Sequence, residues 1–297
     1  MSFVDAMPWL ASPWQQWQRS RDTGRLGHAL LLQGEEGLGK GRLAAEMAAN
    51  LLCEQGIHCG RCKGCRLLQS GHHPDHILIQ PEGLQIKVDT VRALIATLTG
   101  TAHQGGSRVV VIEQAERLNG ASANALLKTL EEPMPGVYLI LVSAIPSALP
   151  ATIVSRCQRL NVPSATPAQL KTYLGEGAQA LPDWPYWTRL VGGPMALKKA
   201  LAQGTVDQVE RWRLAWQQSL EQGFLAPELA SVESDKGAIV LKVLYFELMC
   251  RGRNVPESLA VTFPVMQELL AEIRWLEQQS GVNLQVLCQR FVRQLCS

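Results

Sequence analysis

Short, continuously apolar runs alternate with longer amphipathic stretches in the first half of the chain. Such runs are typical of strands buried on both faces of a parallel sheet, and the stretches between them have helical periodicity. The runs predicted as strands are Ala29–Leu32, His76–Gln80, Arg108–Ile112 and Val137–Val142. The stretches predicted as helices are Arg42–Leu52, Val88–Thr99 and residues 121–131. This alternation predicts a doubly wound parallel α/β sheet, whose ligand crevice lies at the carboxyl ends of the strands.

An aromatic stripe precedes the first predicted strand. Its members, at near-helical spacing, are Trp9, Leu10, Trp14 and Trp17. The spacing predicts a helix that packs its Trp face on the α/β domain, in preference to a binding site. His28, next to the first strand, is expected to be a structural histidine.

The pattern changes near residue 162. Residues 162–167 have the composition of a linker, and β-branched runs are nearly absent beyond them. Short helices are expected over 167–203, with a break at Gly192-Gly193-Pro194, and longer ones at 206–222, 236–250, 264–279 and 283–295. We therefore predict an α/β domain at 1–162, a small helical domain at 163–205 and a helical bundle at 206–297. The bundle serves either as a simple packed core or in oligomerisation.

A glycine-rich loop joins the first predicted strand to its helix. Its sequence is Gly34-Glu35-Glu36-Gly37-Leu38-Gly39-Lys40-Gly41. Loops of the form G-x-x-x-x-G-K-[ST] surround phosphates with backbone N–H groups, while Lys reaches the terminal phosphates and the hydroxyl residue holds Mg²⁺. Gly41 replaces that hydroxyl residue. The candidate nucleotide-binding residues of this degenerate loop, whose occupancy the sequence leaves open, are Gly34, Gly37, Gly39, Lys40 and Gly41.

The two residues after the strand at 108–112 differ from the acidic pair of P-loop ATPases. P-loop ATPases place Asp at such a strand end to hold Mg²⁺, and many add Glu to activate the attacking water. Here Glu113 and Gln114 follow the strand. Glu113 could bind a cation over a longer reach, but Gln114 cannot accept a proton. Together with Gly41, these changes argue against ATP hydrolysis by this chain.

Four of the eight cysteines lie within thirteen residues, in the pattern C-x5-C-x2-C-x2-C. They are Cys53, Cys59, Cys62 and Cys65. Four thiolates this close predict a closed, structural Zn²⁺ site, and an iron–sulfur cluster is the less favoured alternative. The scattered cysteines, expected to be buried or incidental thiols, are Cys157, Cys250, Cys288 and Cys296.

Composition and charge narrow the class of protein. The 297 residues are 46% hydrophobic and 18% charged, as in a soluble globular protein. A net charge of +2 is far from that of a stand-alone nucleic-acid binder, so any DNA contact is expected to be shared with partners. The sequence has no long uncharged apolar run and begins without a signal-peptide pattern, which predicts a cytoplasmic protein.

Two further segments resemble the clamp-loader branch of the AAA+ superfamily. They run from Asn124 to Pro133 and from Leu149 to Cys157. The four-cysteine insertion directly after the P-loop helix is also similar to that of the bacterial clamp-loader ATPase and delta-prime subunits. The departures at Gly41 and Gln114 favour the delta-prime type. The resemblance is dense over residues 24–162 and thin afterwards.

The resemblance implies roles for several residues. Arg156, in Ser155-Arg156-Cys157, would be an arginine finger that reaches the ATP of an adjacent subunit, and Arg159 is the fallback. Ser143 corresponds to the first polar sensor of the family. Met195 and Ala196 occupy the neighbourhood in which active subunits carry a nucleotide-contacting Arg. The helix at 124–133 would contribute to a subunit interface.

The resemblance therefore implies a non-hydrolysing delta-prime-type subunit of the bacterial DNA polymerase III clamp loader. By resemblance, its AAA+ domain with a zinc insertion precedes a helical lid and a helical collar. Its partners would be ATPase subunits, a delta-type subunit and, through the complex, the sliding clamp and primed DNA. One alternative is an ATP-hydrolysing clamp-loader subunit, because Lys40 and three loop glycines remain. Another is a zinc-dependent DNA-binding module, which the near-neutral charge disfavours.

Overall fold

The computed structural model describes residues 3–100, 102–104, 106–175, 184–255, 259–276 and 283–296. The chain forms two compact units, Met1–Gly175 and Glu176–Ser297. The finer division at residues 162 and 205 stays a prediction. None of the described helices combines the length and the hydrophobicity that a membrane span requires.

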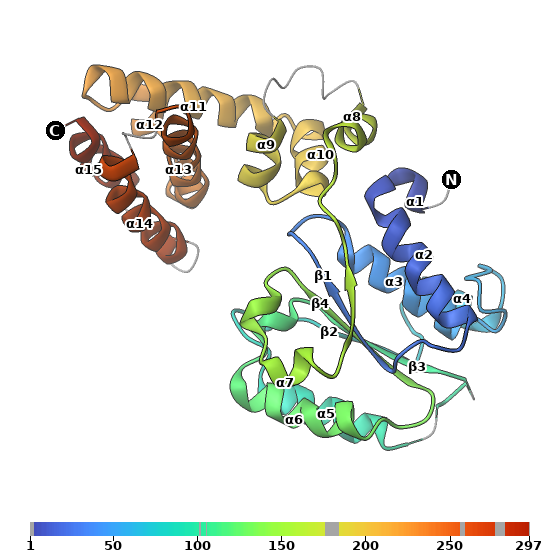
Figure 1. Cartoon of the computed structure of the whole chain (residues 1–297). Helices are drawn as coiled ribbons and strands as arrows, with labels where there is room; N and C mark the ends of the chain where they lie inside the picture. Colours follow the sequence, from blue (N-terminus) through green and yellow to red (C-terminus); the bar gives the residue numbers. More distant parts are fainter. Residues whose placement is uncertain are drawn as a thin grey trace. The chain divides into compact units, whose positions relative to one another are not determined.

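A five-stranded, all-parallel sheet organises the first unit, with the order β2-β3-β4-β1-β5 (Figure 1). The strands are β1 (Ala29–Gln33), β2 (His76–Ile79), β3 (Arg108–Ile112), β4 (Val137–Ser143) and β5 (Gln158–Asn161). The structure confirms the four predicted strands. The sequence analysis missed β5 because three of its four residues are polar. This polarity suits an edge strand, which pairs only with β1.

Helices cover both faces of the sheet (Figure 1). On one face, α5 (Val88–Leu98) and α6 (Gly120–Glu131) bury their apolar sides against alternate strand residues such as Ala29 and Leu31. On the other face, α3 (Lys40–Leu52) packs on β1, β3 and β4, and α2 (Ala11–Asp22) packs on β5. The smaller elements of this unit are α1 (Phe3–Ala6), η1 (Pro8–Leu10), α4 (Lys63–Gln69), η2 (Ala115–Arg117), η3 (Pro146–Ala148), α7 (Ala151–Val154) and α8 (Pro167–Leu174).

The N-terminal aromatic stripe packs as predicted. Trp9 and Trp17 are buried, and Trp14 stacks on Trp17 with ring centroids 4.8 Å apart. The Trp9 indole N–H also donates to the carbonyl of Leu38 over 2.8 Å, a contact that spacing alone did not predict. The aromatic cluster therefore supports the glycine-rich loop directly.

The second unit is helical in its described residues, and its largest buried side chains are Trp187, Trp216 and Phe291. Its elements are α9 (Trp184–Val191), α10 (Pro194–Ala202), α11 (Thr205–Gln222), α12 (Pro227–Ala230), η5 (Ser234–Lys236), α13 (Gly237–Asn254), α14 (Leu259–Leu276) and α15 (Leu284–Cys296). The predicted long helices are confirmed to within a few residues at their ends. The last part of one prediction, residues 277–279, lies outside the described residues.

Candidate functional site

The glycine-rich loop lies at the carboxyl edge of the parallel sheet. It follows β1, and the segments after β3 and β4 leave the sheet at the same edge. Gly34 must be a glycine because a Cβ there would lie 2.5 Å from the carbonyl oxygen of Val162. Gly39 has a φ of +84° immediately before α3 begins at Lys40. The backbone therefore has the form of a phosphate cradle at a helix N-terminus.

The P-loop lysine is bonded to its own loop. Lys40 Nζ donates to the carbonyls of Gly34 and Glu35, both over 2.7 Å. Burial lowers the pKa of Lys40, and the negative charge of Glu116 is the largest opposing effect. The ammonium that would meet terminal phosphates is thus engaged by backbone oxygens.

A carboxylate lies beside Gly41, where a P-loop ATPase carries a hydroxyl residue. A Cβ on Gly41 would lie 2.7 Å from Glu113 Oε1. The other oxygen, Oε2, accepts a 2.7 Å hydrogen bond from the side chain of Gln80. Gln114 is exposed and takes a left-handed φ of +48°.

Glu116 is a site residue that the sequence analysis missed. The short η2 turn brings it back towards the sheet edge, where Oε1 accepts a 3.1 Å hydrogen bond from the N–H of Ala144. Oε2 is buried without a hydrogen bond to any described residue. Ser143 ends β4 fully buried, and its hydroxyl accepts from the N–H of Ile145. The position of Glu116 shortly after the end of β3 is the signal in the sequence that could have identified it.

Arg156 lies in an exposed segment between α7 and β5. Its Nη2 forms a 2.6 Å ion pair with Glu131 Oε1 at the end of α6, and Nη1 donates to the carbonyl of Thr152 over 3.0 Å. The next residue, Cys157, is buried, which raises the pKa of its thiol to about 11. The buried Cys157 anchors the chain while Arg156 stays half-exposed. Arg159, the fallback residue, is exposed on β5.

Residues 124–131 form the C-terminal part of α6, and their leucines pack on the core. Leu126 and Leu130 are buried, and Leu127 is partly buried against the same core. Asn124 and Lys128 are exposed on the outer side of α6, and so is Glu131 one turn further on. Glu131, the last of these three exposed residues, is the one that forms the ion pair with Arg156. Its role in a subunit interface stays a prediction.

The four clustered cysteines converge as their spacing predicted. All four Sγ atoms lie within 4.8 Å of one another, and the sulfurs of Cys53 and Cys62 are 3.8 Å apart. A tetrahedral ion with Zn–S bonds of about 2.3 Å requires sulfur separations of about 3.8 Å. The N–H groups of Gln55 and Cys59 donate to Cys53 Sγ, each over 3.4 Å. The donor set therefore fits a single metal ion.

Burial and hydrogen bonds shift the pKa values of two of these thiols in opposite directions. Burial opposes ionisation of Cys53, but the N–H groups of Cys59, Ile57 and Gln55 lower the pKa of its thiol to about 6. Burial is the largest effect on Cys65 and raises the pKa of that thiol to about 12. A bound cation would favour the thiolate form of both groups.

Comparison with known proteins agrees with this architecture. A family model described as DNA polymerase III, delta subunit, matches residues 10–166. DNA polymerase III subunit delta' of Pseudomonas aeruginosa is 41% identical over 209 residues, which are 66% of this chain and 63% of that protein. The chain belongs to the DNA polymerase III delta-prime family. It spans less than two thirds of the length of the delta-prime relatives that it matches.

Further comparisons match a second delta-prime protein, a tau subunit and a gamma subunit-related protein. Escherichia coli DNA polymerase III subunit delta' is 40% identical over 167 residues, 54% of this chain and 50% of that protein. Escherichia coli DNA polymerase III subunit tau is 36% identical over 154 residues, 51% and 24% of the two chains. A gamma subunit-related protein of Thermotoga maritima shares the fold, with a TM-score of 0.52, 17% identity and coverage of 94% and 99%. The AAA+ fold and the delta-prime relationship predicted from sequence are therefore confirmed.

The remaining predicted site residues belong to the second unit. Met195 and Ala196 lie in the first turn of α10, directly after the confirmed break at Gly193. Neither side chain carries a positive charge, so neither can replace a nucleotide-contacting Arg.

Proposed function

We propose that this delta-prime family member is a non-hydrolysing subunit of a hetero-oligomeric clamp loader. Its partners would be ATPase subunits and a delta-type subunit, which together load the sliding clamp at primed DNA. The observation that carries this proposal is the contrast between two cations of the first unit. Lys40 is buried and bonded to its own loop, whereas Arg156 is half-exposed at the end of α6.

The proposed chemistry of Arg156 is stabilisation of charge in a neighbouring ATP site. A guanidinium supplied in trans neutralises charge that develops on the γ-phosphate, an effect of about 10³–10⁵ in rate in well-studied enzymes. In the absence of a neighbouring ATP site, Glu131 would hold the guanidinium of Arg156. The γ-phosphate, which carries a greater negative charge, would then replace Glu131 as its partner. The exposed side of α6 would then face the neighbouring subunit.

We further propose that the four cysteines hold structural Zn²⁺. Four sulfur ligands leave no position for water, so the ion would fold the insertion and take no part in chemistry. The 3.8 Å separation of Cys53 and Cys62 favours a single ion, because a multi-iron cluster holds its thiolates further apart. The small lid at 163–205 and the collar at 206–297 complete the proposed subunit.

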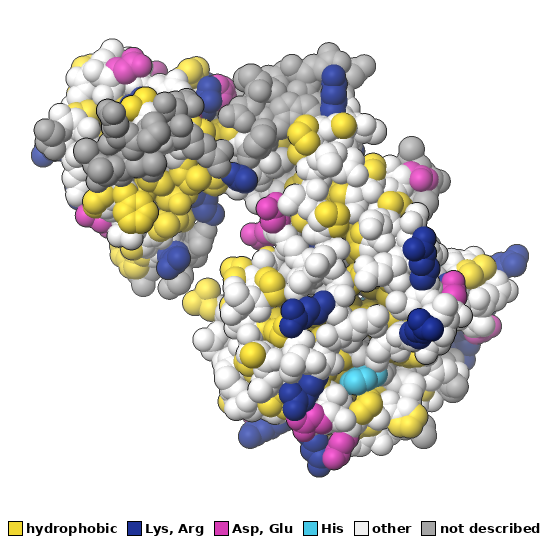
Figure 2. All heavy atoms as spheres, viewed as in Figure 1, with side chains coloured by type: hydrophobic (Ala, Val, Ile, Leu, Met, Phe, Trp, Pro, Cys, Tyr) yellow, Lys and Arg dark blue, Asp and Glu magenta, His cyan; other side chains and the backbone are white. Residues whose placement is uncertain are grey.

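The alternative, an ATP-hydrolysing subunit, rests on the preserved cradle and on Lys40. Glu113 beside Gly41, and an exposed Gln114 in place of a water-activating carboxylate, favour the non-hydrolysing function. Figure 2 shows Lys and Arg side chains scattered among the described residues of the visible face. The net charge of +2 disfavours an independent DNA-binding module.

The test is ATP turnover of the reconstituted complex with Arg156→Ala, Arg156→Lys and the matched control Arg159→Ala. We expect normal assembly, a loss of at least about a hundredfold at the adjacent site for Arg156→Ala, and little rescue by Lys. Arg159→Ala should behave like the parent. Normal turnover with Arg156→Ala would refute the arginine finger. Tight Mg²⁺-dependent nucleotide binding with turnover by the isolated chain would favour the alternative.

A further inference from the structure

The interval between Cys53 and Cys59 is the longest in the metal-binding segment. The two following intervals are compact C-x2-C steps, whereas this one contains five residues. It opens with a turn in which the N–H of Gly56 donates to the carbonyl of Cys53, and Gly56 takes a left-handed φ of +68°. Because ordering a longer loop costs more conformational entropy, this interval most needs support from outside the cysteine cluster.

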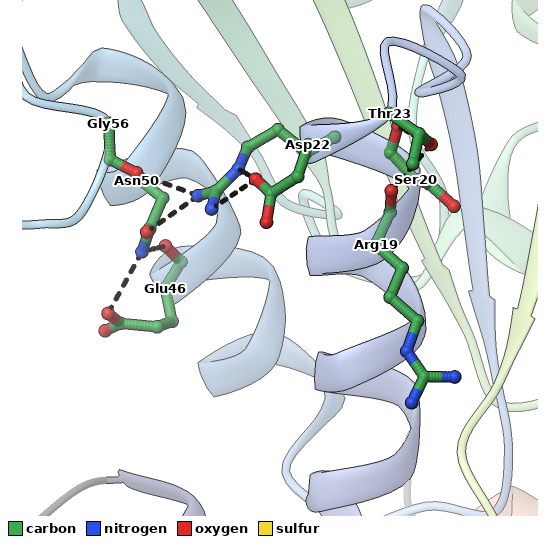
Figure 3. Close-up of polar contacts among 8 residues, drawn as sticks. Arg19, Ser20, Asp22, Thr23, Glu46, Asn50 and Gly56 are labelled. Atoms are coloured by element: carbon green, nitrogen blue, oxygen red, sulfur yellow. Dashed lines mark hydrogen bonds and ion pairs between the residues drawn. The ribbon is translucent and has the colours of Figure 1, made fainter.

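Arg21, at the end of α2, provides such support. Its Nη1 donates to the carbonyl of Gly56 over 2.8 Å and to Asn50 Oδ1 over 3.1 Å (Figure 3). Nε and Nη2 both contact Asp22 Oδ1 at 2.8 Å, and the guanidinium carbon lies 4.9 Å from the centroid of the Trp17 ring. The guanidinium is therefore fixed on two further sides while it holds the turn.

A second set of contacts holds the same loop from α3. Asn50, which is buried, donates to the carbonyl and the carboxylate of Glu46 over 2.9 and 3.2 Å (Figure 3). The carboxylate of Glu46 also lies 2.9 Å from Nδ1 of His58, the residue immediately before Cys59. Arg21 and Glu46 thus connect the middle and the end of the five-residue interval to two packed helices, and Asn50 bonds both of these side chains.

We propose that Arg21 is a positioning residue for the metal centre. Its guanidinium orders the turn at Gly56 before the ion binds. This inference rests on the metal site of the proposed function. Arg21 touches no cysteine sulfur in the described contacts, so its effect on the ion is indirect. With Arg21 in place, Cys53 and Cys59 are already close when the metal arrives, and less ordering is required on binding.

The experiment uses the full chain with Arg21→Ala and Arg21→Lys, and with Arg19→Ala as the matched control. Arg19 is an exposed Arg of the same helix, and Figure 3 shows its side chain pointing away from Asn50 and Gly56. Zinc affinity is measured by competition with a chromophoric chelator. Co²⁺ titration reports the ligand set through its absorption bands, and amide hydrogen exchange of the metal-free proteins reports order in residues 54–58.

For Arg21→Ala we expect a zinc Kd about tenfold higher than that of the parent, and unchanged Co²⁺ bands. We also expect faster exchange in residues 54–58. Arg21→Lys should raise the zinc Kd and the exchange rate of residues 54–58 as well, by smaller factors. If one of the two Arg21 variants fails to fold, the other still provides the test. Arg19→Ala should match the parent. Parent-like zinc affinity and exchange in the Arg21 variants would overturn the inference, whereas no metal binding by the parent would refute the metal site itself.

Discussion

The carboxylate of Glu113 lies against the α-carbon of Gly41, 72 residues earlier in the chain. A Cβ on Gly41 would be 2.7 Å from Glu113 Oε1, whose partner oxygen is held by Gln80. Gly41, which replaces the P-loop hydroxyl residue, and Glu113, which follows β3, therefore lie next to each other in the fold. The glycine makes room for the carboxylate.

This contact predicts coupling between the two positions. Gly41→Ala in a Glu113→Ala background should raise the free energy of unfolding by about 0.5–1 kcal/mol, because Ala is favoured over Gly in a helix. In the parent background part of this gain should be lost, since Glu113 must swing away from Gln80. Urea denaturation of the four proteins in a double-mutant cycle measures the coupling. Equal effects of Gly41→Ala in both backgrounds would contradict the predicted contact.

The ion pair between Arg156 and Glu131 predicts that substitutions of its two members have different effects on ATP turnover by the reconstituted complex. Glu131→Ala should change the free energy of unfolding by less than about 1 kcal/mol, because the pair is substantially exposed. In the reconstituted complex it should leave ATP turnover equal to or above that of the parent, since the guanidinium is released. Glu132→Ala, a neighbouring exposed carboxylate, is the control. A loss as large as that of Arg156→Ala would show that Glu131 is needed in the active arrangement.

Burial of Cys157 predicts a pH dependence of stability. Its thiol has a pKa of about 11 in the folded chain and a reference value of 9.0. The folded state therefore binds more protons between these values, and the stabilising contribution is complete below pH 9 and lost as the pH rises towards 11.

Comparison with Cys157→Ala isolates this contribution. The difference in unfolding free energy between the parent and Cys157→Ala should shift by about 2–3 kcal/mol against the parent from pH 8.5 to 11. Chemical denaturation at each pH measures it, with Cys296→Ala as an exposed-thiol control. A constant difference across this range would be inconsistent with a buried neutral thiol beside Arg156.

The cysteine geometry predicts stoichiometric metal binding. The purified parent should contain about one Zn²⁺ per chain, and Cys65→Ser should contain almost none, because a closed four-sulfur site loses one ligand. Cys296→Ser should retain the ion. Elemental analysis after gel filtration gives the content, and thermal unfolding with and without chelator should show a lower midpoint for the metal-free parent. Equal zinc in the two serine variants would exclude the cluster.

Local features of the chain could be predicted from sequence. The apolar strands, the glycine-rich loop and the cysteine spacing each depend on residues close together in the chain. The correct placement of β1, β3 and β4 follows from their continuous burial. The polar edge strand β5 and the short helix α4 in the insertion were missed, because neither has a strong periodic pattern.

Tertiary structure decided the partners of the functional side chains. Sequence alone identified Gly41, Lys40 and Arg156 but could not pair Gly41 with Glu113, direct Lys40 to loop carbonyls, or bring Arg156 to Glu131. It also gave no signal that Arg21 would hold the turn at Gly56. The physical reason is that hydrophobic burial is non-directional and leaves a periodic trace, whereas a hydrogen bond or ion pair between distant residues depends on where packed helices and strands place each atom.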